Sequence, residues 1–113
     1  MPFIRTTVNV NMTEKNKEKL KTDFGKEISI VSGKAECYLM LAFHDGVTMA
    51  YQGDTSPCAM VEVSLLGSAD ARELDKLTAA ITESIEKELK ISPARVYVNY
   101  TEFKYWGVDG HNV

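Results

Sequence analysis

The residue of this sequence that is best suited to chemistry is Pro2, which follows Met1 at the start of the segment MPFIRTTVNV. Proline is tolerated as the first residue of a β-strand, because its missing N–H need not be paired there. Removal of Met1 would turn Pro2 into a free secondary amine, which can act as a base or a nucleophile. From this segment alone, a structural role and a chemical role both stay open.

The cysteines and histidines form no recognisable site. Cys37 and Cys58 lie in apolar surroundings without C-x-x-C spacing, so we expect buried free thiols in a reducing compartment rather than a disulfide. His44 and His111 stand far apart without metal-ligand spacing. The sequence therefore predicts no metal site.

Length, charge and hydropathy limit the class of protein. The chain has 113 residues, of which 44% are hydrophobic and 26% charged, and this predicts one globular domain over residues 1–113. A net charge of -3 argues against partners such as nucleic acid or an anionic membrane. No segment resembles a membrane span or a signal peptide, so we expect a cytoplasmic protein that is secreted, if at all, by a non-classical route.

The first half of the chain predicts a strand, a helix and a second strand. The strand covers the opening segment, and the helix follows with Thr13 as its N-cap and Gly33 as its stop. The apolar positions at helical spacing are Leu20, Phe24, Ile28 and Val31. The second strand is the apolar run CYLMLAFH, residues 37–44.

The second half repeats this order. CAMVEVSLL, residues 58–66, predicts a strand, and residues 67–90 predict a helix in which Asp70 and Glu73 resemble a capping box. RVYVNYTEF, residues 95–103, predicts a third long strand. Pro2 and Pro57 are 55 residues apart, as are the candidate caps Thr13 and Ser68, so we predict a duplicated βαβ unit with halves at about 1–55 and 56–113.

Two βαβ units predict an α+β fold: a four-stranded mixed sheet with both helices on one face. The other face of the sheet is then bare. The runs YLMLAF and AMVEVSLL are apolar at consecutive positions, which favours burial on both faces of the sheet. The sequence therefore predicts self-association through the bare face.

Six short motifs resemble one family along the whole chain. They are Pro2 after Met1, GK at residues 33–34, SPCAM at 56–60, SLLG at 64–67, ISPARVYVNY at 91–100 and WGVDG at 106–110. In this order they resemble the macrophage migration inhibitory factor family of the tautomerase superfamily. The resemblance implies a homotrimer whose sheets surround a central channel, with an active site at each subunit boundary.

The resemblance also implies an activity. Enzymes of the family interconvert the keto and enol forms of phenylpyruvate-like acids and tautomerise dopachrome-like substrates without a cofactor. Pro2 then corresponds to the general base, whose amine a partly apolar pocket keeps neutral. Lys34 and the backbone N–H of Leu66 correspond to contacts with the substrate carboxylate, and Tyr97 and Asn99 to residues that the neighbouring subunit contributes from one face of a strand.

Aromatic and apolar positions correspond to the wall of the pocket: Phe3, Tyr38, Trp106 and Val108. Plain core packing is the alternative role for these side chains. The family's second C-x-x-C cysteine is absent, since Val61 stands three residues after Cys58, so thiol–disulfide chemistry is not expected. The chain ends in HNV rather than in an aromatic residue, which predicts a weaker or differently packed C-terminal subunit contact.

Three hypotheses remain open. The first is a tautomerase that uses Pro2 on a small aromatic keto or enol acid. The second is a cytokine-like secreted protein that binds a cell-surface receptor through its loops, with a vestigial or regulatory pocket. The third is a ferredoxin-like binding module without catalysis. The combination of Pro2, Lys34, Tyr97 and Asn99 favours the first hypothesis over the third, but does not separate the first from the second.

Overall fold

The structure is a computed structural model that describes all residues, 1–113. Its long elements are β1 (Pro2–Val8), α1 (Glu14–Glu27), β2 (Met40–His44), β3 (Ala59–Leu66), α2 (Ala71–Leu89) and β4 (Val96–Phe103). Two short strands, β5 (Gly107–Val108) and β6 (His111–Asn112), form a C-terminal hairpin. Single 3-10 turns cover Ile28–Ile30, Glu36–Tyr38 and Pro93–Arg95.

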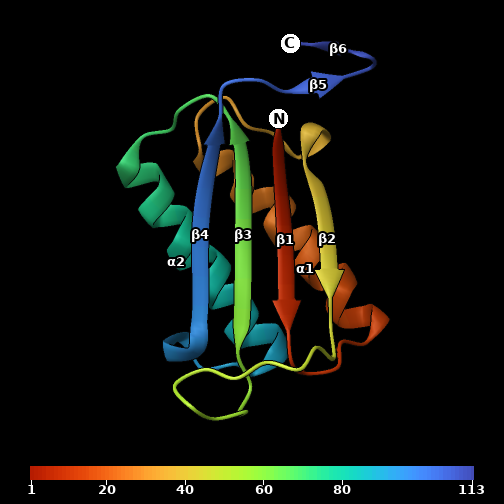
Figure 1. The fold of residues 1–113 in the computed structure, drawn as a ribbon, viewed down its shortest axis with the longest axis vertical. Coiled ribbons are helices and arrows are strands. Elements are labelled where there is room, and N and C mark those ends of the chain that lie inside the picture. The colour runs from red at the N-terminus through yellow and green to blue at the C-terminus, as the bar shows by residue number, and fades with distance from the viewer.

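The sheet has the strand order β2-β1-β3-β4. β1 pairs in parallel with β2, and β3 with β4, whereas β1 and β3 are antiparallel. Figure 1 shows both helices on the same face of this sheet. The predicted α+β fold is therefore confirmed. The two β–α–β units have the same order of elements, although their origin by duplication stays a prediction.

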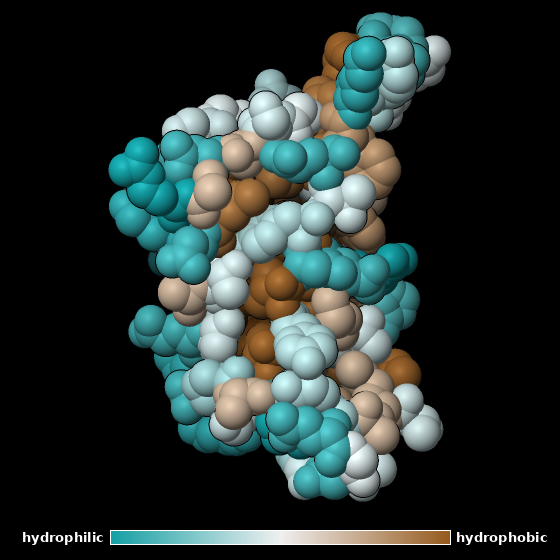
Figure 2. Space-filling view, turned by 60° about the vertical axis from the view of Figure 1, so that its left-hand side comes forward, coloured by the Kyte–Doolittle hydropathy of each residue, from teal (hydrophilic) through white to brown (hydrophobic).

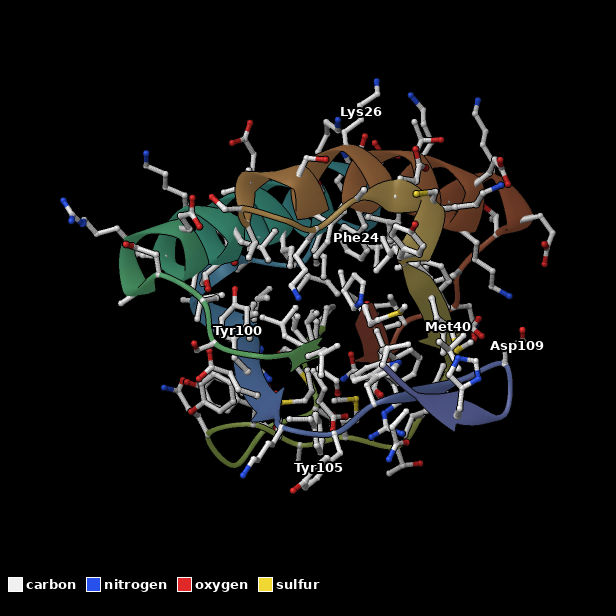
Figure 3. All side chains as sticks on the ribbon, turned by 90° about the horizontal axis from the view of Figure 1, so that it is seen from above. Phe24, Lys26, Met40, Tyr100, Tyr105 and Asp109 are labelled. Carbon is white, nitrogen blue, oxygen red and sulfur yellow. The ribbon has the colours of Figure 1, made fainter.

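The core lies between the sheet and the helices. Alternate residues of β3 point into it, and the helices add fully buried side chains at the predicted spacing, among them Leu20, Phe24, Leu77, Ile81 and Ile85. Figure 3 shows Phe24 between the helix layer and the sheet, while Lys26 of the same helix points into solvent. Neither helix is long and apolar enough to cross a membrane.

The start of α1 agrees with the sequence, but its end does not. Thr13 caps the helix as predicted, because its Oγ1 accepts a hydrogen bond from the Asn16 N–H at 3.0 Å. The helix ends at Glu27 and continues as the 3-10 turn, so Gly33 is not its stop. Gly33 lies instead in a separate tight turn, with a positive φ of 80°.

The start of α2 differs from the prediction as well. Asp70, and not Ser68, is the N-cap: its carboxylate accepts from the Arg72 N–H at 2.8 Å. Glu73 does not complete a capping box, because its carboxylate contacts another segment of the chain. The prediction that the N-caps of the two helices are 55 residues apart is therefore wrong.

The second strand is shorter than predicted. The predicted strand at residues 37–44 begins only at Met40, since Glu36–Tyr38 form a 3-10 turn. Gly25 of α1 allows this turn to pack closely, because a Cβ at Gly25 would overlap the Glu36 carboxylate. Cys37 is consequently exposed, which contradicts the predicted buried thiol, whereas Cys58 is buried as expected.

The bare face of the sheet is partly charged and partly apolar, whereas the sequence predicted an apolar surface. Successive strand residues alternate between the two faces, so β3 buries Val61 and Val63 against the helices and turns Glu62 outward. Glu62 and its β1 neighbour Arg5 form an ion pair, with 3.0 Å between Nη2 and Oε2. The middle of this face is therefore charged, and self-association through the face stays a prediction.

Exposed apolar side chains gather mostly where β1 begins and β4 ends, and Met40 and Phe103 among them lie on the bare face. Those at this end are Tyr38, Met40, Phe103, Tyr105 and Val108. Figure 2, which brings the β4 edge forward, shows hydrophobic side chains amid hydrophilic ones, also at the base of the C-terminal hairpin. The hairpin turn at Asp109 and Gly110 has positive φ at both residues, which is typical of a two-residue β-hairpin loop.

Candidate active site

Pro2 lies at the edge of a cleft of about 590 Å³ at the N-terminal end of β1. We call this space the Pro2 cleft. It is lined by Met1, Pro2, Cys37, Tyr38, Leu39, Met40, Trp106, Gly107 and Val108. The structure thus brings together four of the predicted site residues: Pro2, Tyr38, Trp106 and Val108.

Three segments position these side chains. The 3-10 turn before β2 supplies Tyr38, which is 61% exposed. The segment after β4 supplies Trp106, whose ring meets Phe103 edge-on with 6.1 Å between the centroids. The hairpin supplies Val108, and Figure 3 shows Met40 on the side of β2 that faces this hairpin. The walls of the cleft are therefore largely aromatic and apolar.

Lys34 and Leu66 meet beside the first residues of β1. The Lys34 Nζ donates a hydrogen bond to the Leu66 carbonyl oxygen at 2.7 Å. The Leu66 N–H donates to the Met1 carbonyl oxygen at 3.1 Å. The two predicted anion contacts thus lie together, and in the chain that carries Met1 the Leu66 N–H is already paired.

The electrostatics of this end favour a neutral amine. Burial, followed by the positive charge of Lys34, lowers the pKa of the Met1 amine below its ordinary value. Both causes disfavour the ammonium form. More of an amine at this end of β1 is therefore unprotonated at neutral pH, and able to accept a proton, than of a fully solvated amine.

Phe3 lies in a second cleft on the helix-free side of the sheet. This cleft, of about 500 Å³, is lined by Phe3, Met40, Ser64, Phe103, Tyr105, Trp106 and Gly107. Phe3 follows Pro2 directly, so its side chain points to the opposite face of the strand. The two clefts share Met40, Trp106 and Gly107, but Phe3 does not line the Pro2 cleft.

Tyr97 and Asn99 do not lie near Pro2 within one chain. Both point to the helix-free face of β4, as their alternate positions predicted. Tyr97 is paired with Met60, and Met60 with Thr7 of β1, which is about 16 Å along the strand from Pro2 at about 3.3 Å per residue. Neither Tyr97 nor Asn99 lines the Pro2 cleft of its own chain.

Tyr97 borders a smaller and more enclosed space of about 180 Å³, which we call the Tyr97 cavity. Its ring meets that of Tyr51 edge-on, with 4.9 Å between the centroids. A hydrogen bond with Tyr51 raises the pKa of Tyr97 above its usual value. The cavity is lined by Met49, Ala50, Tyr51, Cys58, Ala59, Met60, Arg95 and Tyr97.

Arg95 organises this end of the sheet, a role that the sequence did not reveal. Its guanidinium donates hydrogen bonds to the carbonyl oxygens of Tyr51, Asp54, Ser56 and Pro57, at 2.9 to 3.3 Å. It also forms an ion pair with the Asp54 carboxylate at 3.2 Å. The motif R-V-Y contains this arginine, but only the folded loop shows that it binds backbone carbonyls.

Cys37 and Met40 of the Pro2 cleft were not predicted as site residues. Cys37 was predicted to be a buried thiol, and Met40 was predicted only as part of an apolar strand, yet both line the cleft. Alternation from Met40 places it on the same face as its partner Phe3. The exposure of Cys37 depends on the 3-10 turn, for which hydropathy gives no signal.

Known proteins share this fold. Residues 1–112 match the family model described as macrophage migration inhibitory factor (MIF). The chain is similar to the crystal structure of MIF2 from Leishmania major, with 33% identity, a TM-score of 0.94, and coverage of 100% of this chain and 97% of that chain.

More distant relatives agree. The chain is similar to the crystal structure of a macrophage migration inhibitory factor homologue from Prochlorococcus marinus, with 26% identity, a TM-score of 0.86 and 97% coverage of each chain. The curated macrophage migration inhibitory factor of Xenopus laevis is 25% identical over 100 residues, which are 88% of this chain and 86% of that protein. The similarity therefore extends over most of the length of this chain and of each of these relatives.

Proposed function

The chain belongs to the macrophage migration inhibitory factor family, within the tautomerase superfamily, and from this premise we propose that it is a cofactor-independent keto–enol tautomerase. Its substrates are phenylpyruvate-like and dopachrome-like compounds. Pro2, freed by removal of Met1, is the general base. The observation that carries this proposal is the meeting of Lys34 and Leu66 beside the residue that precedes Pro2.

The base must accept a proton at neutral pH. While Met1 is attached, the Pro2 nitrogen belongs to an amide, and its lone pair is delocalised into the carbonyl group. After removal of Met1, burial and the charge of Lys34 act on the Pro2 amine as they act on the Met1 amine, whose pKa they lower. A positioned base of this kind typically contributes about 10²- to 10⁴-fold to the rate of proton transfer.

The substrate carboxylate is bound by Lys34 and the Leu66 N–H. Both groups have partners within the chain: the Leu66 carbonyl for Lys34 and the Met1 carbonyl for the N–H. Removal of Met1 frees the N–H, and a carboxylate then gives Lys34 a charged acceptor in place of a neutral one. The planar aryl part of the substrate packs on Tyr38 and Trp106.

The enzyme acts as a homotrimer. Tyr97 and Asn99 supply polar groups that the Pro2 cleft lacks, and they reach it only from a second copy. The exposed apolar side chains around the start of β1, with Met40 at 68% and Tyr105 at 70% exposure, supply the contact surface. The charged middle of the bare face, with Arg5 and Glu62, is then free to line a central channel.

Two preparations of the chain, one with Met1 and one without it, test the proposal. Both are expected to have the same trimeric mass and similar thermal unfolding, but only the trimmed protein ketonises phenylpyruvate efficiently, as followed by ultraviolet absorbance. Alkylation of Pro2 abolishes this activity in step with labelling. Full turnover by protein that retains Met1, as shown by mass spectrometry, would contradict the role of Pro2.

A second function, as a cytokine-like secreted protein, is favoured by the C-terminal hairpin. This hairpin projects beyond the sheet and follows the exposed Tyr105, so it offers a surface for a cell-surface receptor (Figure 1). In this proposal the protein is cytoplasmic and leaves the cell by a non-classical route. Cell binding that persists after alkylation of Pro2 but is lost on deletion of residues 107–113 is the expected result.

A further inference from the structure

Glu73 makes an unusual contact for a residue in the first turn of a helix. The sequence predicts that its carboxylate closes a capping box with Asp70, yet the carboxylate reaches across to Ser32. Its Oε1 accepts from the Ser32 N–H at 3.1 Å, and its Oε2 accepts from the Ser32 Oγ at 2.7 Å. Both carboxylate oxygens are thus occupied by one residue from another segment.

This contact fixes the turn that carries Lys34. Ser32 is two residues before Lys34, and Gly33 between them has a positive φ of 80°. The turn is closed by the Lys34 N–H, which donates to the Val31 carbonyl oxygen at 3.1 Å. Glu73 therefore anchors a short segment, whose backbone otherwise makes only its own turn hydrogen bond, to the N-terminus of α2.

The side chain of Lys34 then extends from an anchored base. Its Nζ lies 2.7 Å from the Leu66 carbonyl oxygen, beside the first residues of β1. A lysine side chain has many rotamers, and fixing its backbone removes part of the entropy that binding an anion would otherwise cost. Hydrogen bonds to a carboxylate are also stronger than those to a neutral acceptor.

We propose that Glu73 is a positioning residue that holds the Ser32–Lys34 turn so that the Lys34 ammonium is aimed at the substrate carboxylate. This inference rests on the proposed tautomerase function and names a residue outside the Pro2 cleft on which binding of acidic substrates depends. Glu73 itself touches neither the substrate nor Pro2. Its loss weakens binding of the carboxylate and leaves proton transfer at Pro2 intact.

The test compares Glu73→Ala, Glu73→Gln and Ser32→Ala in the trimmed trimer. Glu86→Ala is the matched control, because Glu86 is exposed on the same helix and makes no side-chain hydrogen bond or ion pair. The readouts are kcat and KM for phenylpyruvate and for its methyl ester. Inhibition constants of 3-phenylpropanoate and 3-phenylpropanamide measure binding without turnover.

Glu73→Ala is expected to raise the KM for phenylpyruvate and the inhibition constant of 3-phenylpropanoate by about three- to tenfold. The kcat for phenylpyruvate, the KM for its methyl ester and the inhibition constant of 3-phenylpropanamide are expected to change by less than about twofold, because none of them depends on the contact between Lys34 and a carboxylate. Glu73→Gln, which keeps one acceptor oxygen, and Ser32→Ala, which keeps the backbone N–H, should give smaller effects in the same direction. Glu86→Ala should behave as the unchanged protein.

The outcomes separate this inference from the function on which it rests. Equal changes for acid and ester, or a fall in kcat with unchanged KM, overturn the role of Glu73 while the tautomerase function stands. If the trimmed protein without any substitution does not turn over phenylpyruvate, the proposed function is wrong, and this inference is wrong with it. Ser32→Ala leaves α2 untouched, so its acid-to-ester ratio decides the matter if Glu73→Ala gives little folded protein.

Discussion

At the Pro2 end of the sheet the side chains form an open cleft, whereas at the Tyr97 end they form a smaller, more enclosed cavity. The Pro2 cleft has a candidate base and apolar walls, and the Lys34 ammonium lies nearby on the Leu66 carbonyl, beside the first residues of β1. The Tyr97 cavity has phenol groups and a guanidinium held by backbone carbonyls. Each end offers groups that the other lacks, which is what a site shared between two copies of one chain requires.

The two free cysteines allow the sharpest test of this contrast, because one lies at each end. Cys37 is exposed in the Pro2 cleft, whereas Cys58 is 4% exposed beside the Tyr97 cavity. We expect a maleimide to label Cys37 in the native protein at least about 100-fold faster than Cys58, which must wait for local or global opening. Mass spectrometry of single-cysteine variants measures both rates.

Labelling also reports on the proposed site. A large adduct on Cys37 should block phenylpyruvate turnover, since the thiol lines the same cleft as Pro2. Cys37→Ser is the control and should keep its turnover in the presence of the reagent. Similar labelling rates for the two thiols would show that the Pro2 cleft is closed in solution.

Replacement of Lys34 by alanine should weaken binding of the substrate carboxylate at the Pro2 end of the sheet and leave the Tyr97 cavity unchanged. The variant loses a charge-assisted hydrogen bond to the carboxylate, so binding of phenylpyruvate should fall by about 10- to 100-fold. Binding of the methyl ester to this variant should weaken much less. Steady-state kinetics on both substrates give the ratio, and equal losses for acid and ester would show that Lys34 is not the anion contact.

The sequence predicted the layers of this fold well because hydrophobic periodicity records burial against the helices. Helical spacing located the buried faces of α1 and α2, and two βαβ patterns gave the mixed sheet. The same periodicity did not show that the middle of the bare face is charged. In AMVEVSLL only Glu62 and Ser64 show which side faces outward, and the pairing of Glu62 with Arg5 becomes visible only across strands.

Contacts between distant segments limited the prediction of the site. Local pattern suggested that Glu73 would cap its own helix, but its partner Ser32 is 41 residues away in the sequence. The 3-10 turn that exposes Cys37 depends on Gly25, which admits the Glu36 carboxylate. Lys34 and Leu66 were paired through the family resemblance, not through any spacing in the chain.

A third prediction concerns the helix layer behind both ends, where α1 contacts α2. Glu27 is half-buried there, and burial raises its pKa from 4.5 to about 7. This value is the net of several causes: besides burial, Asp23 and Glu83 raise the pKa, whereas a hydrogen bond from the Ser84 Oγ at 2.6 Å and the charge of Lys87 lower it. The other Glu27 oxygen is buried without a hydrogen-bond partner.

Because the folded state holds the Glu27 proton more tightly than the unfolded state, its contribution is fully present below pH 4.5 and is lost as the pH rises through about 7. After allowance for solvent screening, we expect the free energy of unfolding to fall by about 1–2 kcal/mol between pH 5 and pH 8. Glu27→Gln should flatten this profile in denaturant titrations. An unchanged slope in the variant would assign the pH dependence to other groups.

The smallest expected effect lies between the two ends, in the middle of β1. Thr6 is fully buried on the helix side, and its hydroxyl oxygen has no hydrogen-bond partner. A buried hydroxyl without a partner is destabilising, so Thr6→Val, which keeps the branched shape, should stabilise the protein by about 1 kcal/mol. This corresponds to a rise in Tm of about 4 °C for a domain of this size.

Thr7→Val, on the opposite face of the same strand, is the matched control and should change Tm little. Both variants should keep the labelling rates of Cys37 and Cys58, because neither alters an end of the sheet. Thermal unfolding at one fixed protein concentration measures the effect, since association of copies would make Tm depend on concentration. A lower Tm for Thr6→Val would mean that the Thr6 hydroxyl is paired in solution, and that the middle of β1 is held by a polar contact as its two ends are.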